Sequence, residues 1–246
     1  MGLELRQVSK SYPNGAVGAR NVDLVVKAGQ FVALFGPSGS GKTSQLHMLG
    51  LLQQPDSGEV WIDGERVDGL SEGDSAKLRR TKLGFVFQSA SLIGLISARE
   101  NVDISMRLNG LRGRDARAKV EDALATVGMA ERMEHRPDEM SGGEQQRVSI
   151  ARALVHEPEH LLADEPTGEL DTVTGTGILT MLRTIADAGT TVVMATHDPK
   201  AIEFVDTAYF VESGALHLPD RDELTLWLAE GTAFDTTKAD RDSPER

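Results

Sequence analysis

The sequence contains no cysteine, which excludes disulfide bonds and thiolate metal sites and agrees with a reducing compartment. It also lacks long apolar runs. Segments such as residues 31–35 are far shorter than the about 18 apolar residues that a membrane-spanning helix needs. Residues 1–15 carry charges where a signal peptide would need an uninterrupted apolar stretch. We therefore expect a chain that spans no membrane and remains in the cytoplasm.

Positive charge is also scarce, with 26 lysine and arginine residues against 38 aspartate and glutamate residues and a net charge of −12. A protein this acidic repels nucleic acid and anionic lipid surfaces, so we expect no nucleic-acid partner. Residues 231–246 lack apolar periodicity and are predicted to form a disordered acidic tail. Just before them, Leu224, Trp227 and Leu228 stand at i, i+3 and i+4, which predicts a short helix packed on the domain.

The remaining sequence has the pattern of one α/β domain over residues 1–230. Residues 1–30 alternate apolar and polar positions, which is typical of antiparallel strands. A helical pattern extends from about 97 to 133, inside a predicted helical subdomain at about 90–150. Short strand patterns occur at 30–35, 58–67, 83–87, 160–163 and 191–195. We predict a mixed, mainly parallel sheet with an N-terminal antiparallel β subdomain and a helical subdomain.

A glycine-rich loop joins the strand at 30–35 to the next helical pattern. Its glycines allow backbone N–H groups to curl around phosphate oxygens, while the positive end of the helix points at the same charge. Lys42 would reach the β and γ phosphates, and the Thr43 hydroxyl would bind Mg²⁺. The sequence therefore predicts a P-loop NTPase core, although this loop alone does not say which nucleotide hydrolase. The predicted phosphate loop consists of Gly36, Pro37, Ser38, Gly39, Ser40, Gly41, Lys42 and Thr43, followed by Ser44.

Two carboxylates follow the strand at 160–163. Asp164 is placed to hold the metal through water, and Glu165 to activate a water molecule for attack on the γ phosphate. The alternative is a strand that ends in a solvated acidic turn. His197 ends the strand at 191–195, where its imidazole could contact the γ phosphate or hold Glu165 and the water in place. A histidine at a strand end can equally be structural.

A second predicted anion-binding helix start lies at Ser141, Gly142 and Gly143. The alternative is an N-cap without a ligand. The segment 140–147 resembles the signature of ABC ATPases, with Met140 for the usual leucine and Glu144 for the usual glutamine. With DEPTGELD and the later THD in the same order, the chain is identified over residues 1–218 as a member of this family.

The resemblance implies a dimer in which ATP lies between the phosphate loop of one copy and the signature, Ser141 to Glu144, of the other. It implies that Gln88 senses Mg²⁺ and the γ phosphate. Asp171 would cross to the opposite subunit, and Tyr12 would stack on adenine, although Tyr12 alone could be an ordinary strand-end aromatic. The predicted catalytic residues are Lys42, Gln88, Glu165 and His197, and the predicted metal residues are Thr43, Gln88 and Asp164.

Within the family, the chain is most similar to the lipoprotein-releasing, macrolide-export and cell-division branch. The similarity lies in LGFVFQ at 83–88, ENV at 100–102 and DEPTGELDTVTG at 164–175. Three positions differ from related members: Glu169 stands where they have asparagine, Ser44 where they have threonine, and Gly94 near a usual proline. None of these differences removes a catalytic group.

The leading hypothesis is an ATPase subunit that couples dimer closure to a separate integral membrane permease, peripherally on the cytoplasmic face of the membrane. Leu92, Ile93, Leu95 and Ile96 could form part of the docking surface or pack in the core. The alternative is a soluble ABC-type ATPase that acts without a permease. Such proteins typically have a coiled-coil insert, zinc-binding cysteines or two cassettes. A phosphate-loop kinase or GTPase would leave the signature without a purpose.

Overall fold

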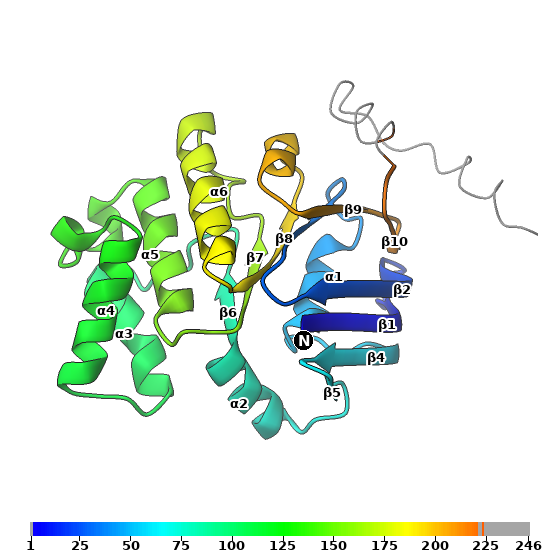
Figure 1. Cartoon of the computed structure of the whole chain (residues 1–246), viewed down its shortest axis with the longest axis horizontal. Coiled ribbons are helices and arrows are strands. Elements are labelled where there is room, and N and C mark those ends of the chain that lie inside the picture. Colours follow the sequence, from blue (N-terminus) through cyan, green and yellow to red (C-terminus); the bar gives the residue numbers. More distant parts are fainter. Residues whose placement is uncertain (1, 221–222, 224–246) are drawn as a thin grey trace, which may run out of the picture.

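The computed structural model describes residues 2–220 and residue 223, so the predicted helix and acidic tail within 224–246 lie outside the described residues. Figure 1 shows the main helical region at one side, the parallel sheet in the middle and the N-terminal sheet at the other side. The elements, with η for short 3₁₀-helices, are β1 (Gly2–Ser11), β2 (Val17–Lys27), β3 (Phe31–Phe35), α1 (Lys42–Leu49), β4 (Ser57–Ile62), β5 (Glu65–Arg66), α2 (Glu72–Lys82), β6 (Leu83–Val86), α3 (Ala98–Leu108), α4 (Arg114–Thr126), η1 (Ala130–Arg132), η2 (Pro137–Glu139), α5 (Gly142–Leu154), β7 (His160–Asp164), α6 (Thr172–Asp187), β8 (Thr191–Thr196), η3 (Pro199–Glu203), β9 (Thr207–Glu212) and β10 (Ala215–His217).

A six-stranded sheet, in the order β10-β9-β3-β8-β7-β6, forms the centre of the described residues. Strands β3, β6, β7, β8 and β9 run parallel, and β10 pairs antiparallel with β9. Phe35 lies opposite Thr196, and Asp164 lies opposite Ala195. The carboxyl ends of β3, β7 and β8 therefore lie side by side, at the edge where parallel α/β sheets bind ligands.

The N-terminal strands form a separate antiparallel sheet in the order β2-β1-β4-β5. Asp63 and Gly64 turn the chain between β4 and β5 with φ angles of 52° and 83°, the left-handed geometry that a two-residue hairpin turn requires. Together the two sheets confirm the predicted fold class, a mainly parallel sheet with an N-terminal antiparallel β subdomain and a helical subdomain.

Strand β3 is buried on both faces, which explains its continuous apolar sequence. Phe31, Ala33 and Phe35 contribute to the cluster that also holds residues of α5 and α6. Val32 and Leu34 contribute to a second cluster, shared with α1 and the N-terminal sheet. The strand that leads into the phosphate loop is therefore fixed between two hydrophobic layers.

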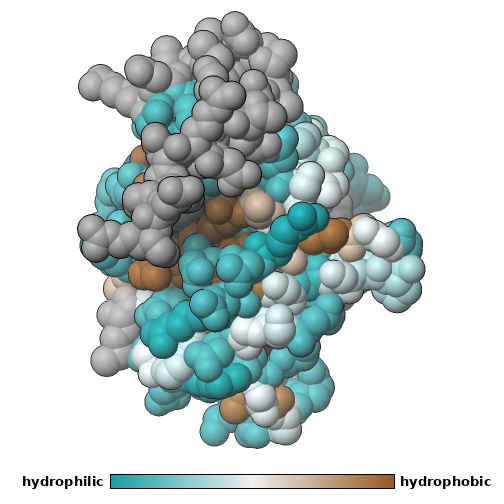
Figure 2. All heavy atoms as spheres, turned by 90° about the vertical axis from the view of Figure 1, so that its right-hand side faces the viewer, coloured by the Kyte–Doolittle hydropathy of each residue, from teal (hydrophilic) through white to brown (hydrophobic). Residues whose placement is uncertain are grey.

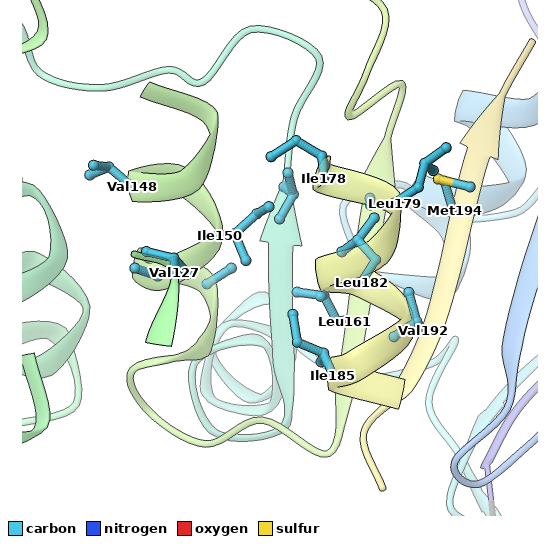
Figure 3. Packing of buried hydrophobic residues seen from close by; sticks show 14 of the residues in the cluster. Val127, Val148, Ile150, Leu161, Ile178, Leu179, Leu182, Ile185, Val192 and Met194 are labelled. Atoms are coloured by element: carbon cyan, nitrogen blue, oxygen red, sulfur yellow. The ribbon is translucent and has the colours of Figure 1, made fainter. Parts of the chain in front are cut away.

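Helix α6 covers one face of the parallel sheet. In Figure 3, Leu179 and Leu182 of α6 point toward the sheet, where Leu161 of β7 and Val192 and Met194 of β8 meet them. All five side chains are fully buried. Because Asp164 follows Leu161 closely on β7, this packing also fixes the strand end that carries the predicted acidic residues.

The predicted helical stretch at about 97–133 is divided in the structure. Helix α3 ends at Leu108 and α4 begins at Arg114. Gly110 and Gly113 lie between them with φ angles of 77° and 86°, a backbone conformation that glycine adopts without strain and that a helix does not allow. The glycine pair therefore turns the chain so that α3 and α4 pack on each other and on α5.

The N-terminal sheet packs its apolar side inward and exposes a charged side. Leu3 and Leu5 of β1 are buried, whereas Arg6 is exposed and pairs with Glu4. Figure 2 shows this end of the molecule, where hydrophilic residues predominate around one hydrophobic hollow. Among the described residues, no helix is both long enough and apolar enough to cross a membrane.

Candidate functional site

The predicted phosphate loop lies between β3 and α1, as the sequence indicates. Gly36, Gly39 and Gly41 have positive φ angles of 149°, 78° and 112°. A Cβ atom at Gly36 would collide with the Val211 carbonyl oxygen, so a larger residue does not fit there. Among the described residues, no side chain caps the start of α1, and the buried Ser40 hydroxyl has no hydrogen-bond partner. The loop thus offers unsatisfied donors to an anion.

Lys42 begins α1, and its ammonium group reaches back over the loop. The Nζ atom donates to the carbonyl oxygens of Gly36 at 2.8 Å and Pro37 at 3.1 Å. It also lies 3.5 Å from Oε1 of Glu165. The side chain is only 5% exposed, so its charge acts within a mostly water-free region and is strong there.

Thr43 and Asp164 meet across the gap between α1 and β7. The Thr43 hydroxyl donates to Oδ1 of Asp164 at 3.0 Å, and His47 Nε2 lies 3.9 Å from Oδ2. Burial raises the pKa of the Asp164 carboxyl above its ordinary value, an effect that the Thr43 bond and the nearby His47 oppose. Hydroxyl and carboxylate oxygens are the ligands that Mg²⁺ prefers, so these two residues fit a Mg²⁺ site.

Glu165 lies between the phosphate loop and β8. Its Oε2 atom is 2.8 Å from His197 Nδ1 and accepts a 3.3 Å bond from the His197 backbone N–H. Its own N–H donates to the Ala195 carbonyl at 2.9 Å. The side chain is 13% exposed, with one oxygen toward Lys42 and the other toward His197. This arrangement holds a carboxylate at the carboxyl edge of the sheet, facing the loop.

Gln88 follows β6 and has an exposed side chain. A Cβ atom built at Gly168 would lie 3.7 Å from the Gln88 amide nitrogen and 3.6 Å from Cβ of Glu165. The Gln88 amide therefore lies beside the loop that follows Glu165. Its role in sensing Mg²⁺ and the γ phosphate remains a prediction.

Tyr12 lies beside the start of α1 and is half-buried. Its hydroxyl donates to Oε1 of Gln53 at 2.8 Å and lies 2.8 Å from Oγ of Ser44. These bonds fix the ring next to the phosphate loop, where a base attached to bound phosphates could reach it. Stacking of Tyr12 on adenine remains a prediction.

The signature residues occupy the start of α5. Ser141 is the N-cap of this helix and accepts from the Glu144 N–H at 3.3 Å. A Cβ at Gly143 would collide with the Thr174 methyl group, and Asp171 caps α6 by accepting from the Thr174 N–H at 3.1 Å. The two helix starts are therefore adjacent. Within the described residues, no hydrogen bond or ion pair links the segment 141–144 to the phosphate loop.

Three residues that the sequence does not mark as functional lie next to the predicted site residues or bind the backbone near them. His47 stands four residues after Thr43, on the same face of α1, so helical spacing could have indicated it. Gln146 donates to the Phe87 carbonyl at 3.3 Å, just before Gln88. The Arg152 guanidinium donates to carbonyl oxygens of the segment that follows. These last two pairs lie about sixty residues apart, and no local pattern predicts them.

The loop, the Thr43–Asp164 pair and the Glu165–His197 pair together define a P-loop protein built to hold the phosphates of a nucleotide. The family model described as ABC transporter matches residues 19–168, more than half of the chain. This chain therefore belongs to the ABC transporter family and is one of its ATP-binding cassettes.

Two relatives show the range of architectures that contain such a cassette. An uncharacterized ABC transporter ATP-binding protein of Thermotoga maritima is 44% identical over 207 residues, covering 83% of this chain and 87% of the relative. The macrolide export ATP-binding/permease protein MacB of Azoarcus sp. is 41% identical over 215 residues, which are 86% of this chain and 33% of MacB. Similarity to MacB confirms the predicted relation to the macrolide-export branch.

Solved structures agree with the family. The cassette MJ0796 of Methanocaldococcus jannaschii, determined as a dimer in a post-hydrolysis state bound to ADP and Pi, aligns with a TM-score of 0.80 and 37% identity over 88% of this chain and 98% of that chain. The cbiO1 protein of Clostridium perfringens, part of the transporter complex cbiONQ, aligns with a TM-score of 0.82 and 27% identity over 93% of this chain and 91% of that chain.

Proposed function

We propose that this chain hydrolyses MgATP at the carboxyl edge of its parallel sheet and transmits the resulting movement to a membrane permease on a separate chain. One observation carries the proposal. Residues at the start of α1, at the end of β7 and directly after β7 and β8 meet beside one glycine-rich loop: Lys42, Thr43, Asp164, Glu165 and His197. Bound Mg²⁺, held by Thr43 and Asp164 with Gln88 nearby, would neutralise charge on the phosphates.

In this proposal the protein residues position ATP and remove a proton from water. The loop N–H groups and Lys42 hold the phosphates, and Lys42 counters the negative charge that develops on the γ phosphate. Glu165 accepts the proton of the attacking water on the oxygen that faces the loop. His197 holds the other oxygen at 2.8 Å and thereby fixes the orientation of the carboxylate. Tyr12 stacks on adenine.

The signature and the residue Asp171 belong, in this proposal, to a second copy's site. Among the described residues, no hydrogen bond or ion pair links the segment 141–144 to the phosphate loop of the same chain. The phosphate loop can therefore receive the signature of a second copy. MJ0796 is described as dimeric and bound to ADP and Pi, which supports a dimer here. In the proposal, its two copies pack head to tail. Two ATP molecules would then lie between two copies, each held by one loop and by Ser141 to Glu144 of the opposite copy.

A permease partner is supported by the relatives. MacB is named as an ATP-binding/permease protein, and this chain matches only a third of its length. We infer that the permease here is a separate integral membrane chain and that it holds the cassette on the cytoplasmic face of the membrane.

In this proposal, the loop that follows Gln88 and a neighbouring groove form the docking surface for that permease. Leu95 is 84% exposed and Ile93 is 48% exposed, whereas Leu92 is partly buried against the core. The four apolar residues at 92–96 thus divide between the two roles considered from the sequence. This groove is lined by arginines and by apolar side chains of β6, of the residue that follows it and of α3, among them Phe85, Phe87, Ile104, Leu108, Arg79, Arg80 and Arg152.

The phosphate-loop assignment is tested by Lys42→Ala. Loss of the ammonium removes the charge that faces the β and γ phosphates, so we expect nucleotide binding or turnover to be abolished. Phosphate release and binding of a fluorescent ATP analogue measure the two effects. Lys77→Ala, which removes an exposed lysine of α2, is the matched control and should retain activity. Unchanged hydrolysis in Lys42→Ala would show that this loop is not the catalytic phosphate site.

A further inference from the structure

The signature of this chain contains a carboxylate at the position where glutamine is usual, and that carboxylate is already bound. Glu144 is the third residue of α5. Its Oε2 atom accepts from the Ser141 backbone N–H at 2.9 Å and from the Ser141 hydroxyl at 3.0 Å. The side chain therefore occupies two donors at the helix start, the N–H and the hydroxyl of Ser141, which an incoming phosphate could otherwise use.

The other oxygen of Glu144 has a separate cationic partner. Arg132, the last residue of η1, places Nε 3.0 Å from Oε1. The Ser141 N–H holds the pKa of Glu144 below its ordinary range, and its hydroxyl, Arg132 and His135 contribute in the same direction. Glu144 is thus negatively charged at neutral pH. Its side chain is 26% exposed and that of Arg132 is 49% exposed, so both can be reached from outside.

A charged Glu144 conflicts with the proposed role of the helix start. If the start of α5 meets the γ phosphate of ATP bound to a second copy, two negative groups approach each other, and their repulsion weakens closure. Because Arg132 binds the oxygen that Ser141 leaves free, it can neutralise the carboxylate without displacing the cap. It can also keep the carboxylate at the side of the helix start when Ser141 turns to a phosphate.

We propose that Arg132 is a positioning residue for ATP-driven dimer closure: by neutralising and holding Glu144, it allows the start of α5 to accept the nucleotide of the opposite copy. This inference rests on the proposed head-to-tail dimer. It assigns to Arg132, which lies outside the signature, a role that exists only because residue 144 is acidic.

The test is a double-mutant cycle in a Glu165→Gln background, which should accumulate the closed state. Arg132→Gln, Glu144→Gln and the pair are compared by light scattering at one protein concentration, with the ATP concentration for half-maximal dimerisation as the readout. With Glu144 present, we expect Arg132→Gln to raise that concentration about fivefold, as loss of one partly exposed charge pair next to an anion predicts. When Glu144→Gln is also present, we expect Arg132→Gln to change it by less than about twofold.

Two further measurements separate a charge effect from a structural one. Arg132→Lys keeps the positive charge and should restore most of the ATP response. The difference between the Arg132→Gln variant and its reference should also shrink as NaCl is raised, because salt screens exposed charges. Arg117→Gln removes an arginine of α4 whose pair with Glu121 has the same 3.0 Å distance, and this control should leave the ATP requirement unchanged.

Failure of this inference differs from failure of the proposed function. If the Glu165→Gln reference dimerises with ATP but Arg132→Gln has no effect, or has an equal effect with and without Glu144→Gln, Arg132 has no such role and the dimer model stands. If the reference itself remains monomeric at every ATP concentration, the proposed dimer and the role of Arg132 are both wrong.

Discussion

Glu165 adopts a backbone conformation that few non-glycine residues adopt. Its φ angle is 46°, and its N–H is bound to the Ala195 carbonyl of the neighbouring strand. Such left-handed positions carry strain that the surrounding structure must balance, and they occur often at functional sites. Here the turn directs the side chain back over the phosphate loop, between Lys42 and His197. The sequence predicts this residue as the catalytic base, but only the backbone geometry explains the direction of its side chain.

Asp164 has a raised pKa, so the folded protein binds a proton at this carboxyl more strongly than the unfolded chain does. This contribution to stability is therefore present at low pH and lost as pH rises through the folded value. At neutral pH the ionised carboxylate is therefore unfavourable in the nucleotide-free protein. Asp164→Asn should raise the melting temperature of that state at pH 7, and the gain should disappear toward pH 4.

The same substitution should weaken the response to the ligand. Asparagine can still accept the Thr43 bond, but it lacks the charge that a Mg²⁺ ion requires. Stabilisation by MgATP, measured as the shift in melting temperature on addition of nucleotide, should fall well below that of the original protein. If Asp164→Asn lowers stability at pH 7 and keeps the full MgATP shift, the assignment of Asp164 to the metal is wrong.

Among the elements, α5 joins three parts of the proposed mechanism. Its start carries the signature at Ser141, and Gln146 in its middle holds the carbonyl of Phe87, the residue before Gln88. Near its end, Arg152 donates to the carbonyl oxygens of Ala90 at 2.9 Å and Ser91 at 2.8 Å and also lines the groove. If a partner bound in the groove moves Arg152, α5 would move as a rigid helix and would shift the backbone next to Gln88.

This arrangement predicts that a charge in the groove uncouples the cassette from its permease. Leu108, at the end of α3, is 63% exposed and lines the groove. In vesicles that contain the reconstituted transporter, Leu108→Asp should reduce the stimulation of ATP hydrolysis by the permease. Leu218→Asp is the matched control, because Leu218 is also 63% exposed and lies after β10. Hydrolysis by each isolated chain checks that the substitution leaves the fold intact. Equal effects of the two substitutions would argue against docking at this groove.

Local elements could be predicted from the sequence more completely than the contacts between them. The strand, loop and helix around Lys42 follow from an apolar run, glycines and a basic residue, which are neighbours in the chain. The break at Gly110 and Gly113 was missed because isolated glycines occur in helices as well as between them. The bonds of Gln146 and Arg152 to the segment after β6 were also missed, since nothing near either residue in the chain marks its distant partner.

For the whole molecule, the proposed dimer would give each chain two different half-sites. The phosphate loop lies at the carboxyl edge of the sheet, whereas the signature begins α5 and is joined to Arg132 and to the start of α6. The dimeric structure of MJ0796 supports the proposal that two copies share these half-sites. Composition alone indicated an acidic α/β protein. It contained no information on how two copies would combine to complete a site.

Whether two copies close around ATP can be measured with the Glu165→Gln variant. The substitution keeps the shape of the side chain and the ATP contacts but removes the base, so turnover should fall by roughly 10² to 10⁴ while ATP binding survives. The closed state should then accumulate. Light scattering should report a shift from monomer to dimer when ATP is added, and adding Ser141→Arg, which places a bulky cation at the start of α5, should block the shift. A Glu165→Gln protein that binds ATP tightly yet stays monomeric at high protein concentration would contradict the proposed closure of two copies around ATP.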